Sequence, residues 1–234
     1  MTDFSDLSNG SDWVKHLSER LAVLQPDIPA PVRLIAVTKT FPAAAVAAAY
    51  QLGLRDFGES KIQEAAQKRQ QLSDLKDVTW HLIGHLQTNK ARKALQLFDW
   101  IHSVDSLKLA QKLNQAAGER PHPPRCCLQV KIVPDPDKYG FEPDQLIAAL
   151  PQLDQLDHLK ILGLMTILPL GLTPTETQSA FTKVQILADH INKIGLSRIQ
   201  IDYLSMGMSE DFRSAIAAGA TFIRLGTTLF GHRQ

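Results

Sequence analysis

Eight short apolar segments recur along the chain, and a helix-like segment separates nearly every one from the next. They are RLIAVTK (33–39), RDFGE (55–59), VTWHLIG (78–84), DWIHSV (99–104), CCLQVKI (126–132), LKILGLMTI (159–167), IDYLSMG (201–207) and TFIRLG (221–226). Regular alternation of strands and helices predicts parallel strands joined by right-handed crossovers. Eight such units in 234 residues predict a closed α/β structure, the (β/α)8 or TIM barrel.

The predicted barrel spans about residues 32–231, and a further helix of about residues 11–25 precedes it and is expected to cover its base. The competing architecture is an open, doubly wound sheet. A G-x-G-x-x-G turn after the first strand would favour that sheet, and the sequence has none there. No linker, low-complexity segment or charge block marks a second domain, so residues 1–234 are expected to form one domain without a C-terminal β-domain.

Charge and cysteine content exclude several classes of partner. The formal net charge of +1 gives no reason to expect nucleic acid or a membrane surface as a partner. No apolar stretch is long enough to span a bilayer, and the polar, acidic N-terminus is not a signal peptide. Cys126 and Cys127 are adjacent on a predicted strand, so they point to opposite faces and are not expected to form a disulfide. These features predict a cytoplasmic protein.

In a barrel of this kind the active site lies at the C-terminal ends of the strands, and Lys39 ends the first one. A lysine at the mouth of an apolar barrel loses hydration, which lowers its pKa and makes its amine a better nucleophile for a Schiff base. The alternative is a lysine whose long stem simply reaches from the rim into water. Position alone leaves these two interpretations evenly balanced.

The last two strands end in turns that suit an anion. Gly226 and Thr227 can present backbone N–H groups and a hydroxyl, and Gly207 with Ser209 forms a second small turn that opens a helix. The alternative is that these glycines only permit tight turns. Arg224 would stand beside the ligand, or else pair with a carboxylate in the core. A phosphate site near Lys39 fits either a Schiff-base aldolase acting on a sugar phosphate or retention of pyridoxal 5′-phosphate (PLP).

Several stretches together resemble the YggS/PROSC family of PLP homeostasis proteins, which is similar to the N-terminal barrel of alanine racemase. They are LIAVTKTFP, DFGES-x-x-QE, WHLIGHLQTNK, SVDS, KYGF, GLMTI and LSMGMSEDFRSAIAAGATFIRLGTTLFG. The resemblance implies that Lys39 carries PLP as an internal aldimine and that Arg224 faces the pyridine nitrogen. It also implies a set of further cofactor-binding residues, which are the phosphate contacts Ser209, Gly226 and Thr227, the nearby Ser205 and Met206, and His81 and Met165 along the ring pocket.

One position departs from that family. Ser60 stands where the family usually has asparagine, so a short hydroxyl replaces an amide beside the expected ring.

Two expectations concern other polar residues. His81, His85 and His102 lie on different segments without ligand spacing, so no metal site is expected. Glu59 is expected to be an exposed carboxylate paired with Lys90 or Lys61.

A racemase needs proton donors on both faces of the cofactor, and Lys39 can serve only one. The related racemases take a tyrosine for the other face from a second, β-rich domain, whereas this chain ends at Gln234. Of its tyrosines, only Tyr139 is expected near the barrel mouth.

We therefore expect no catalytic residue, and a monomer that holds PLP reversibly for vitamin B6 and amino-acid or keto-acid balance. Its partners would be PLP, free amino acids and, transiently, PLP apoenzymes. The alternative is a PLP-dependent amino-acid racemase or lyase, and weak racemase-type activity fits either case.

Overall fold

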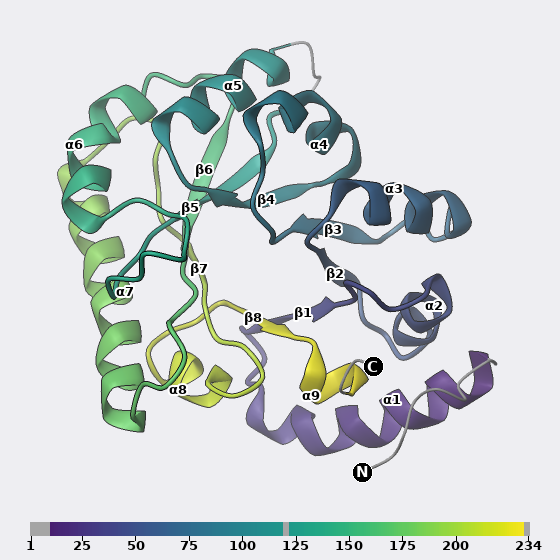
Figure 1. The fold of residues 1–234 in the computed structure, drawn as a ribbon. Coiled ribbons are helices and arrows are strands. Elements are labelled where there is room, and N and C mark those ends of the chain that lie inside the picture. Colours follow the sequence, from purple (N-terminus) through teal and green to yellow (C-terminus); the bar gives the residue numbers. More distant parts are fainter. Residues whose placement is uncertain (1–9, 119–121, 232–234) are drawn as a thin grey trace.

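A computed structural model, described over residues 10–118 and 122–231, contains a closed barrel whose eight strands follow one another in chain order (Figure 1). The strands are β1 (Arg33–Val37), β2 (Asp56–Glu59), β3 (Thr79–Leu82), β4 (Trp100–Val104), β5 (Arg125–Gln129), β6 (Lys160–Met165), β7 (Tyr203–Ser205) and β8 (Phe222–Leu225). β1 pairs in parallel with β8, from Arg33 opposite Phe222 to Ala36 opposite Leu225, and this pairing closes the barrel. The predicted barrel is confirmed, and the open sheet is excluded.

Helices surround the barrel and connect its strands (Figure 1). They are α1 (Gly10–Leu24), α2 (Ala43–Gln51), α3 (Ile62–Gln71), α4 (Ala91–Leu97), α5 (Leu107–Ala117), α6 (Pro143–Leu153), α7 (Pro174–Ile194), α8 (Phe212–Ala217) and α9 (Thr227–Phe230), with short 3-10 turns η1 (Gln25–Asp27) and η2 (Thr88–Lys90). Local sequence sets the bounds of α7, because Thr173 and Glu176 form a capping box at its start. Gly195 ends it in the left-handed conformation, with φ of 73°.

Buried side chains form two clusters on the two faces of the strands. The cluster inside the barrel comprises Ile35, Trp100, Cys127, Met165 and Phe222, one residue from each of five strands. The larger cluster fills the space between the strands and the helices and includes Cys126. The adjacent cysteines therefore point to opposite faces, as the strand alternation predicts, and both are free thiols.

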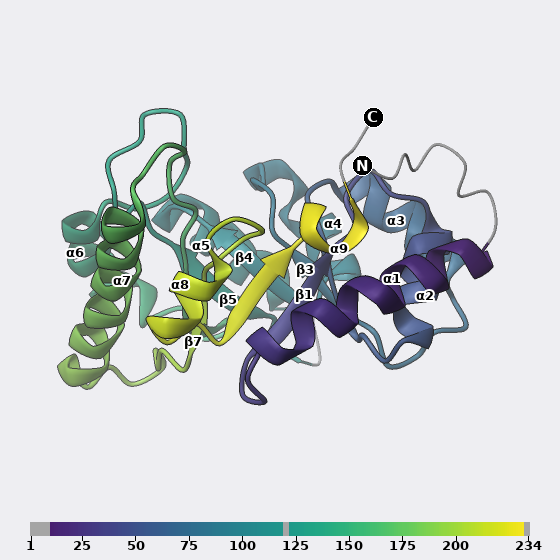
Figure 2. The same ribbon diagram turned by 90° about the horizontal axis from the view of Figure 1, so that it is seen from below.

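The N-terminal helix packs against the side of the barrel rather than across its base, which corrects the expectation from sequence. Helix α1 runs alongside α2 and α9 (Figure 2). The reason is aromatic packing, because the Trp13 ring meets Phe41 and Phe230 edge-on, with centroids 5.8 and 6.3 Å away. The Arg20 guanidinium also donates a hydrogen bond to the Thr228 carbonyl at 2.9 Å.

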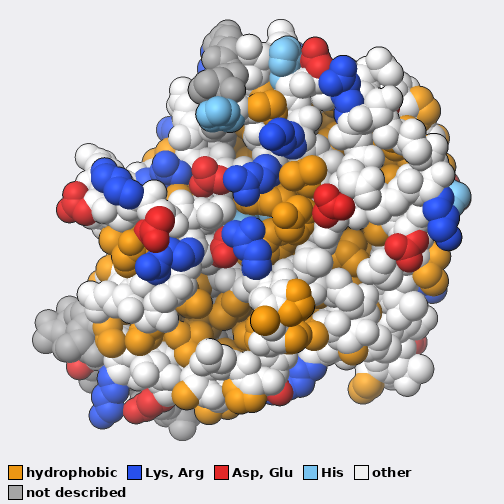
Figure 3. Space-filling view, turned by 180° about the vertical axis from the view of Figure 1, so that it is seen from behind, with side chains coloured by type: hydrophobic (Ala, Val, Ile, Leu, Met, Phe, Trp, Pro, Cys, Tyr) orange, Lys and Arg blue, Asp and Glu red, His pale blue; other side chains and the backbone are white. Residues whose placement is uncertain are grey.

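The surface carries both signs of charge. Figure 3 shows basic and acidic side chains intermingled on one face of the molecule, in keeping with the net charge of +1. Within residues 10–118 and 122–231, no helix has the length and apolar character that crossing a membrane requires.

Candidate functional site

A cavity of about 800 Å³ opens at the C-terminal ends of the strands. Its wall includes two loops, of which one joins β5 to α6 and the other joins β6 to α7. Figure 2 shows both loops rising on the side of the barrel toward which β8 points. Most residues that the sequence singles out line this cavity, namely Lys39, Ser60, Ser209, Arg224, Gly226 and Thr227.

Strand alternation places Lys39 in the cavity. Ile35 lies in the cluster inside the barrel, and Val37 and Lys39, two and four residues further on, line the cavity above it. Thr38 points the other way and is fully buried. Lys39 itself lines the cavity and is half-buried, so its side chain is partly withdrawn from water.

A buried polar cluster holds the turn that carries Lys39. The Lys68 ammonium donates hydrogen bonds to the Thr38 carbonyl at 2.6 Å, to Glu59 at 2.6 Å and to Glu64 at 2.7 Å. The Thr38 hydroxyl donates to Glu59 at 2.6 Å, and the Thr40 N–H donates to Glu64. Thr40 has a positive φ of 70°, a conformation that non-glycine residues seldom adopt. These contacts therefore fix the backbone on both sides of Lys39.

Glu59 belongs to this cluster and is not on the surface. Its side chain is 0% exposed and pairs with Lys68, which corrects the expectation of an exposed carboxylate beside Lys90 or Lys61. Burial raises the pKa of the Glu59 carboxyl, although Lys68 and Thr38 act in the opposite direction. The physical reason is that β2 turns residue 59 outward beneath α3, where Lys68 reaches it.

Arg224 is buried beside the cavity and bonds to neutral groups. One terminal nitrogen donates to the Ser205 hydroxyl and the other to the Thr166 carbonyl, both at 2.8 Å. Burial lowers the pKa of the guanidinium to about 10, so it remains charged at neutral pH. Among the described residues no carboxylate forms an ion pair with it, so the core-arginine alternative is not the arrangement found.

The two turns after β7 and β8 differ in why they contain glycine. Gly207 has φ of +91°, and a Cβ there would lie 2.6 Å from the Cβ of Ala215, so packing alone requires glycine. A Cβ on Gly226 would meet nothing closer than 3.5 Å. Ser209 links the two turns, because its hydroxyl accepts a hydrogen bond from the Thr228 N–H at 3.2 Å. Close packing therefore explains Gly207, while Gly226 has room beside the cavity.

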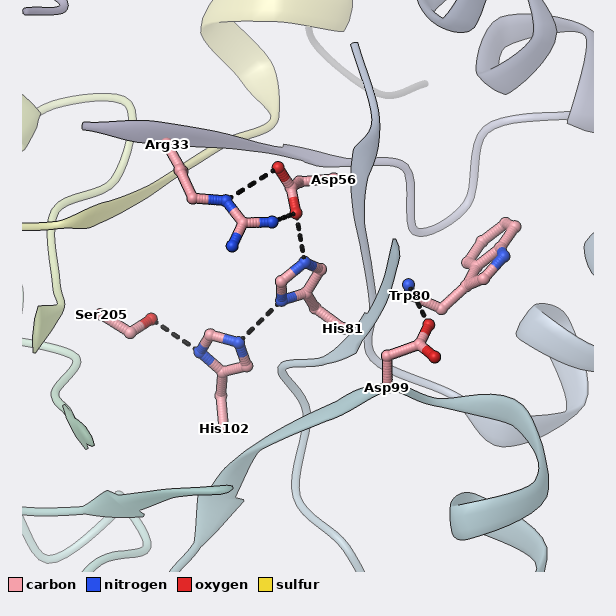
Figure 4. A network of polar contacts seen from close by, with 7 residues as sticks. All are labelled: Arg33, Asp56, Trp80, His81, Asp99, His102 and Ser205. Carbon is pink, nitrogen blue, oxygen red and sulfur yellow. Dashed lines mark hydrogen bonds and ion pairs between the residues drawn. The ribbon is translucent and has the colours of Figure 1, made fainter. Parts of the chain in front are cut away.

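The remaining predicted residues lie behind the cavity wall. His81, Met165, Ser205 and Met206 are each 0% exposed and do not line the cavity. Ser205 supports Arg224 from below, and Met165 belongs to the cluster inside the barrel. His81 lies deeper, where it bonds to His102 and Asp56 (Figure 4).

Tyr139 lines the cavity, as expected from the sequence, whereas Gln129 and the loop after β6 were not indicated by sequence patterns. Tyr139, 57% exposed, stacks on His85 with ring centroids 3.6 Å apart. The Gln129 amide donates to the Tyr139 carbonyl at 2.8 Å and holds this loop to β5. Gln129 follows Cys127 by two residues and could have been found from strand alternation. The loop residues 167–172 leave no periodic signal.

These groups suit a phosphorylated carbonyl compound. The cavity combines a lysine amine, a charged guanidinium and the hydroxyls of Ser209 and Thr227. An amine can form an imine with a carbonyl group, while the guanidinium and hydroxyls can bind acceptor atoms and anionic oxygens. Within the described part of the chain, no group of three or more His, Cys, Asp or Glu side chains is arranged so that it could hold a metal ion.

Residues 14–234 match the family model for the alanine racemase N-terminal domain. Alanine racemase from Clostridium difficile has the same fold, with a TM-score of 0.75 at 15% identity, over 94% of this chain and 57% of that one. The fold and cavity thus define a barrel of the alanine racemase N-terminal type.

Proteins with higher sequence identity to this chain identify its family within that class. A pyridoxal phosphate homeostasis protein from Synechocystis is 51% identical over 216 residues, covering 92% of this chain and 96% of that protein. One from Pseudomonas aeruginosa is 43% identical over 206 residues, covering 88% and 86%. The structure of PipY from Synechococcus elongatus with PLP bound has 52% identity and a TM-score of 0.87, covering 92% and 100%. The chain belongs to the pyridoxal phosphate homeostasis protein family.

Proposed function

We propose that this protein binds PLP reversibly as a Schiff base on Lys39 and serves vitamin B6 and amino-acid or keto-acid balance. The observation that carries the proposal is the meeting of Lys39 and Arg224 at one cavity. Support comes from PipY, 52% identical, whose structure contains PLP.

The residues present fit this cofactor. PLP supplies an aldehyde, whose carbon bonds to the Lys39 nitrogen with loss of one water, and water reverses the reaction. Arg224 can only donate, so it would direct an N–H toward the pyridine nitrogen and keep that nitrogen unprotonated. Ser209, Thr227 and the backbone of Gly226 would hold the phosphate, with Ser60 beside the ring. Ser205 would support Arg224 directly, whereas His81, Met165 and Met206 are fully buried outside the cavity lining and would act only through their neighbours.

We propose retention of the cofactor rather than turnover. The curated relatives are called homeostasis proteins, a description without an enzyme activity. The second candidate is a racemase or lyase, because Tyr139 and His85 line the cavity and could act as a second base. Incubating the loaded protein with L-alanine in deuterated water separates the two. We expect negligible α-proton exchange, and fast exchange with racemisation would establish the second candidate instead.

The decisive test of the cofactor proposal is borohydride reduction of the PLP-loaded protein followed by peptide mapping. A pyridoxyl adduct is expected on Lys39 and is expected to vanish in Lys39→Ala. Lys138→Ala is the matched control, because Lys138 lines the same cavity and should leave the adduct unchanged. An adduct that persists in Lys39→Ala, or none in the parent protein, would refute the assignment.

We further propose that free amino acids release PLP by displacing Lys39, and that PLP then passes transiently to apoenzymes. We propose that the protein acts as a monomer in the cytoplasm, where Cys126 and Cys127 would remain thiols. Light scattering checks the monomer, and absorbance after addition of an amino acid checks the displacement.

A further inference from the structure

A continuous chain of hydrogen bonds crosses the inside of the barrel from its base to Arg224. Arg33 donates to Asp56, from its Nε at 3.2 Å and from a terminal nitrogen as well. Nε2 of His81 lies 2.9 Å from Asp56 Oδ1, and Nδ1 of His81 lies 2.9 Å from Nε2 of His102. Nδ1 of His102 lies 2.8 Å from the Ser205 hydroxyl, which also contacts Arg224. Figure 4 shows these links except the last.

The two ends of this chain dictate its direction. A guanidinium can only donate, so the Ser205 oxygen accepts from Arg224, and the single Ser205 proton is left for His102. His102 then accepts at Nδ1 and carries its proton on Nε2, from which it donates to His81. His81 in turn accepts at Nδ1 and donates from Nε2 to the Asp56 carboxylate.

Donation in the opposite direction along the chain would leave the Ser205 hydroxyl proton without an acceptor. With a proton on Nδ1 of each histidine, the Ser205 oxygen would accept from both His102 and Arg224. Its own proton would then have no acceptor, because the described residues offer the Ser205 hydroxyl no other hydrogen-bond partner, side chain or backbone, and its side chain is 0% exposed.

The surroundings of the two imidazoles favour their neutral forms. The Phe222 ring lies 5.7 Å from His81 and 5.6 Å from His102 between centroids, and Trp100 lies 6.3 and 5.7 Å away. Burial lowers the pKa of both histidines. Burial alone would raise the pKa of Asp56, but hydrogen bonds from His81 and Arg33 outweigh it and keep the group an acceptor.

We infer that His102 is a positioning residue for the ligand-facing Arg224, acting through Ser205, and that His81 and Asp56 fix its tautomer. The Ser205 lone pair is thereby always directed at Arg224, and the guanidinium is held at one nitrogen by Ser205 and at the other by Thr166. The inference rests on the proposed function where it concerns PLP, because the acceptor that Arg224 serves is the pyridine nitrogen of that proposal.

The first test uses the protein without cofactor. Long-range proton–nitrogen NMR of histidine-labelled protein reports which ring nitrogen carries the proton, and His81→Phe and His102→Phe assign the signals. We expect both residues to be neutral with the proton on Nε2, unchanged from pH 8 to pH 6. A proton on Nδ1 of His102, or a cationic ring at pH 8, would overturn the inference. This result is independent of PLP binding.

The second test is a double-mutant cycle on PLP affinity. Ser205→Ala and His102→Phe are each expected to raise the Kd about tenfold, as loss of one hydrogen bond to a charged group would do. Because both act through one chain, the double variant should be no weaker than the singles. Ser205→Thr keeps the hydroxyl and should restore binding. Cys127→Ala removes bulk inside the barrel without removing any of these hydrogen bonds and should leave the Kd within about twofold.

Additive losses in this cycle, or equal losses in Cys127→Ala, would show a packing effect and overturn the inference. Failure of the proposed function has a different signature. In that case the Lys39 adduct is missing from the parent protein, while the NMR signals still decide whether the chain runs toward Asp56. If a variant does not fold, the NMR spectrum of the parent protein decides the inference, because it reports which histidine nitrogens carry protons.

Discussion

The turn that presents Lys39 depends on residues that never reach the cavity. Lys68 comes from α3 and neutralises the fully buried Glu59 while also bonding to the Thr38 carbonyl. An ion pair in such a position contributes little net stability as a pair, but removing one partner leaves an uncompensated charge in the interior. The position of Lys39 is therefore sensitive to a residue on another element.

We expect Lys68→Met to reduce the free energy of unfolding by about 3–5 kcal/mol, because Glu59 loses its counter-ion. Urea denaturation at pH 7.5 measures the loss. Lys61→Met is the control, since Lys61 is exposed beside the same strand and should change stability by less than about 0.5 kcal/mol. A loss below about 1 kcal/mol in Lys68→Met would mean that the pair is not needed.

At the scale of elements, the turn between β7 and α8 helps to position the backbone of Arg224. The Gly207 carbonyl accepts a hydrogen bond from the Arg224 N–H at 3.0 Å, so the turn after β7 is joined to β8. Direct pairing of β7 with β8 is limited to Ser205 opposite Phe222. The turn therefore joins β7 and β8 by a hydrogen bond beyond the single residue pair that the short strand β7 provides.

We expect Gly207→Ala to cost about 2–4 kcal/mol, because a positive φ and a close contact with Ala215 act together. Gly195→Ala is the matched control. Gly195 has a positive φ of 73° but nothing within 4 Å of an added Cβ, so about 1 kcal/mol is expected. Denaturant midpoints compare the two variants, and equal losses would show that the contact with Ala215 can relax.

At the scale of the whole molecule, the barrel interior contains polar groups that must remain uncharged. Burial lowers the pKa of His81 and, further, that of His102, so the folded protein takes up protons less readily than the unfolded chain below about pH 6.5. Stability from these groups is complete above that pH and is lost as the pH falls toward the folded pKa values.

We expect the free energy of unfolding of the cofactor-free protein to fall between pH 7.5 and 5.5. Each buried histidine contributes a slope of up to about 1.4 kcal/mol per pH unit. His102→Phe should therefore have a shallower slope than the parent protein, whatever its absolute stability. Urea unfolding at several pH values measures the slopes, and an unchanged slope in His102→Phe would contradict the neutral, buried assignment.

The fold follows from the sequence because its signal is periodic. Strands buried on both faces produce apolar runs, and eight such runs separated by helices leave few arrangements besides a barrel. The same reasoning places Lys39 and Arg224 near the cavity, since both lie at the C-terminal ends of strands. It fails for α1, whose position depends on where the Trp13, Phe41 and Phe230 rings meet.

By itself, the sequence determined the barrel, the end of it that carries the cavity, and the lysine and arginine that line that cavity. Only the tertiary structure decided which polar groups meet, such as Glu59 with Lys68 and His102 with Ser205, 103 residues away. The physical reason is that strand periodicity states which face a side chain occupies, whereas its partners depend on how neighbouring strands align when the barrel closes.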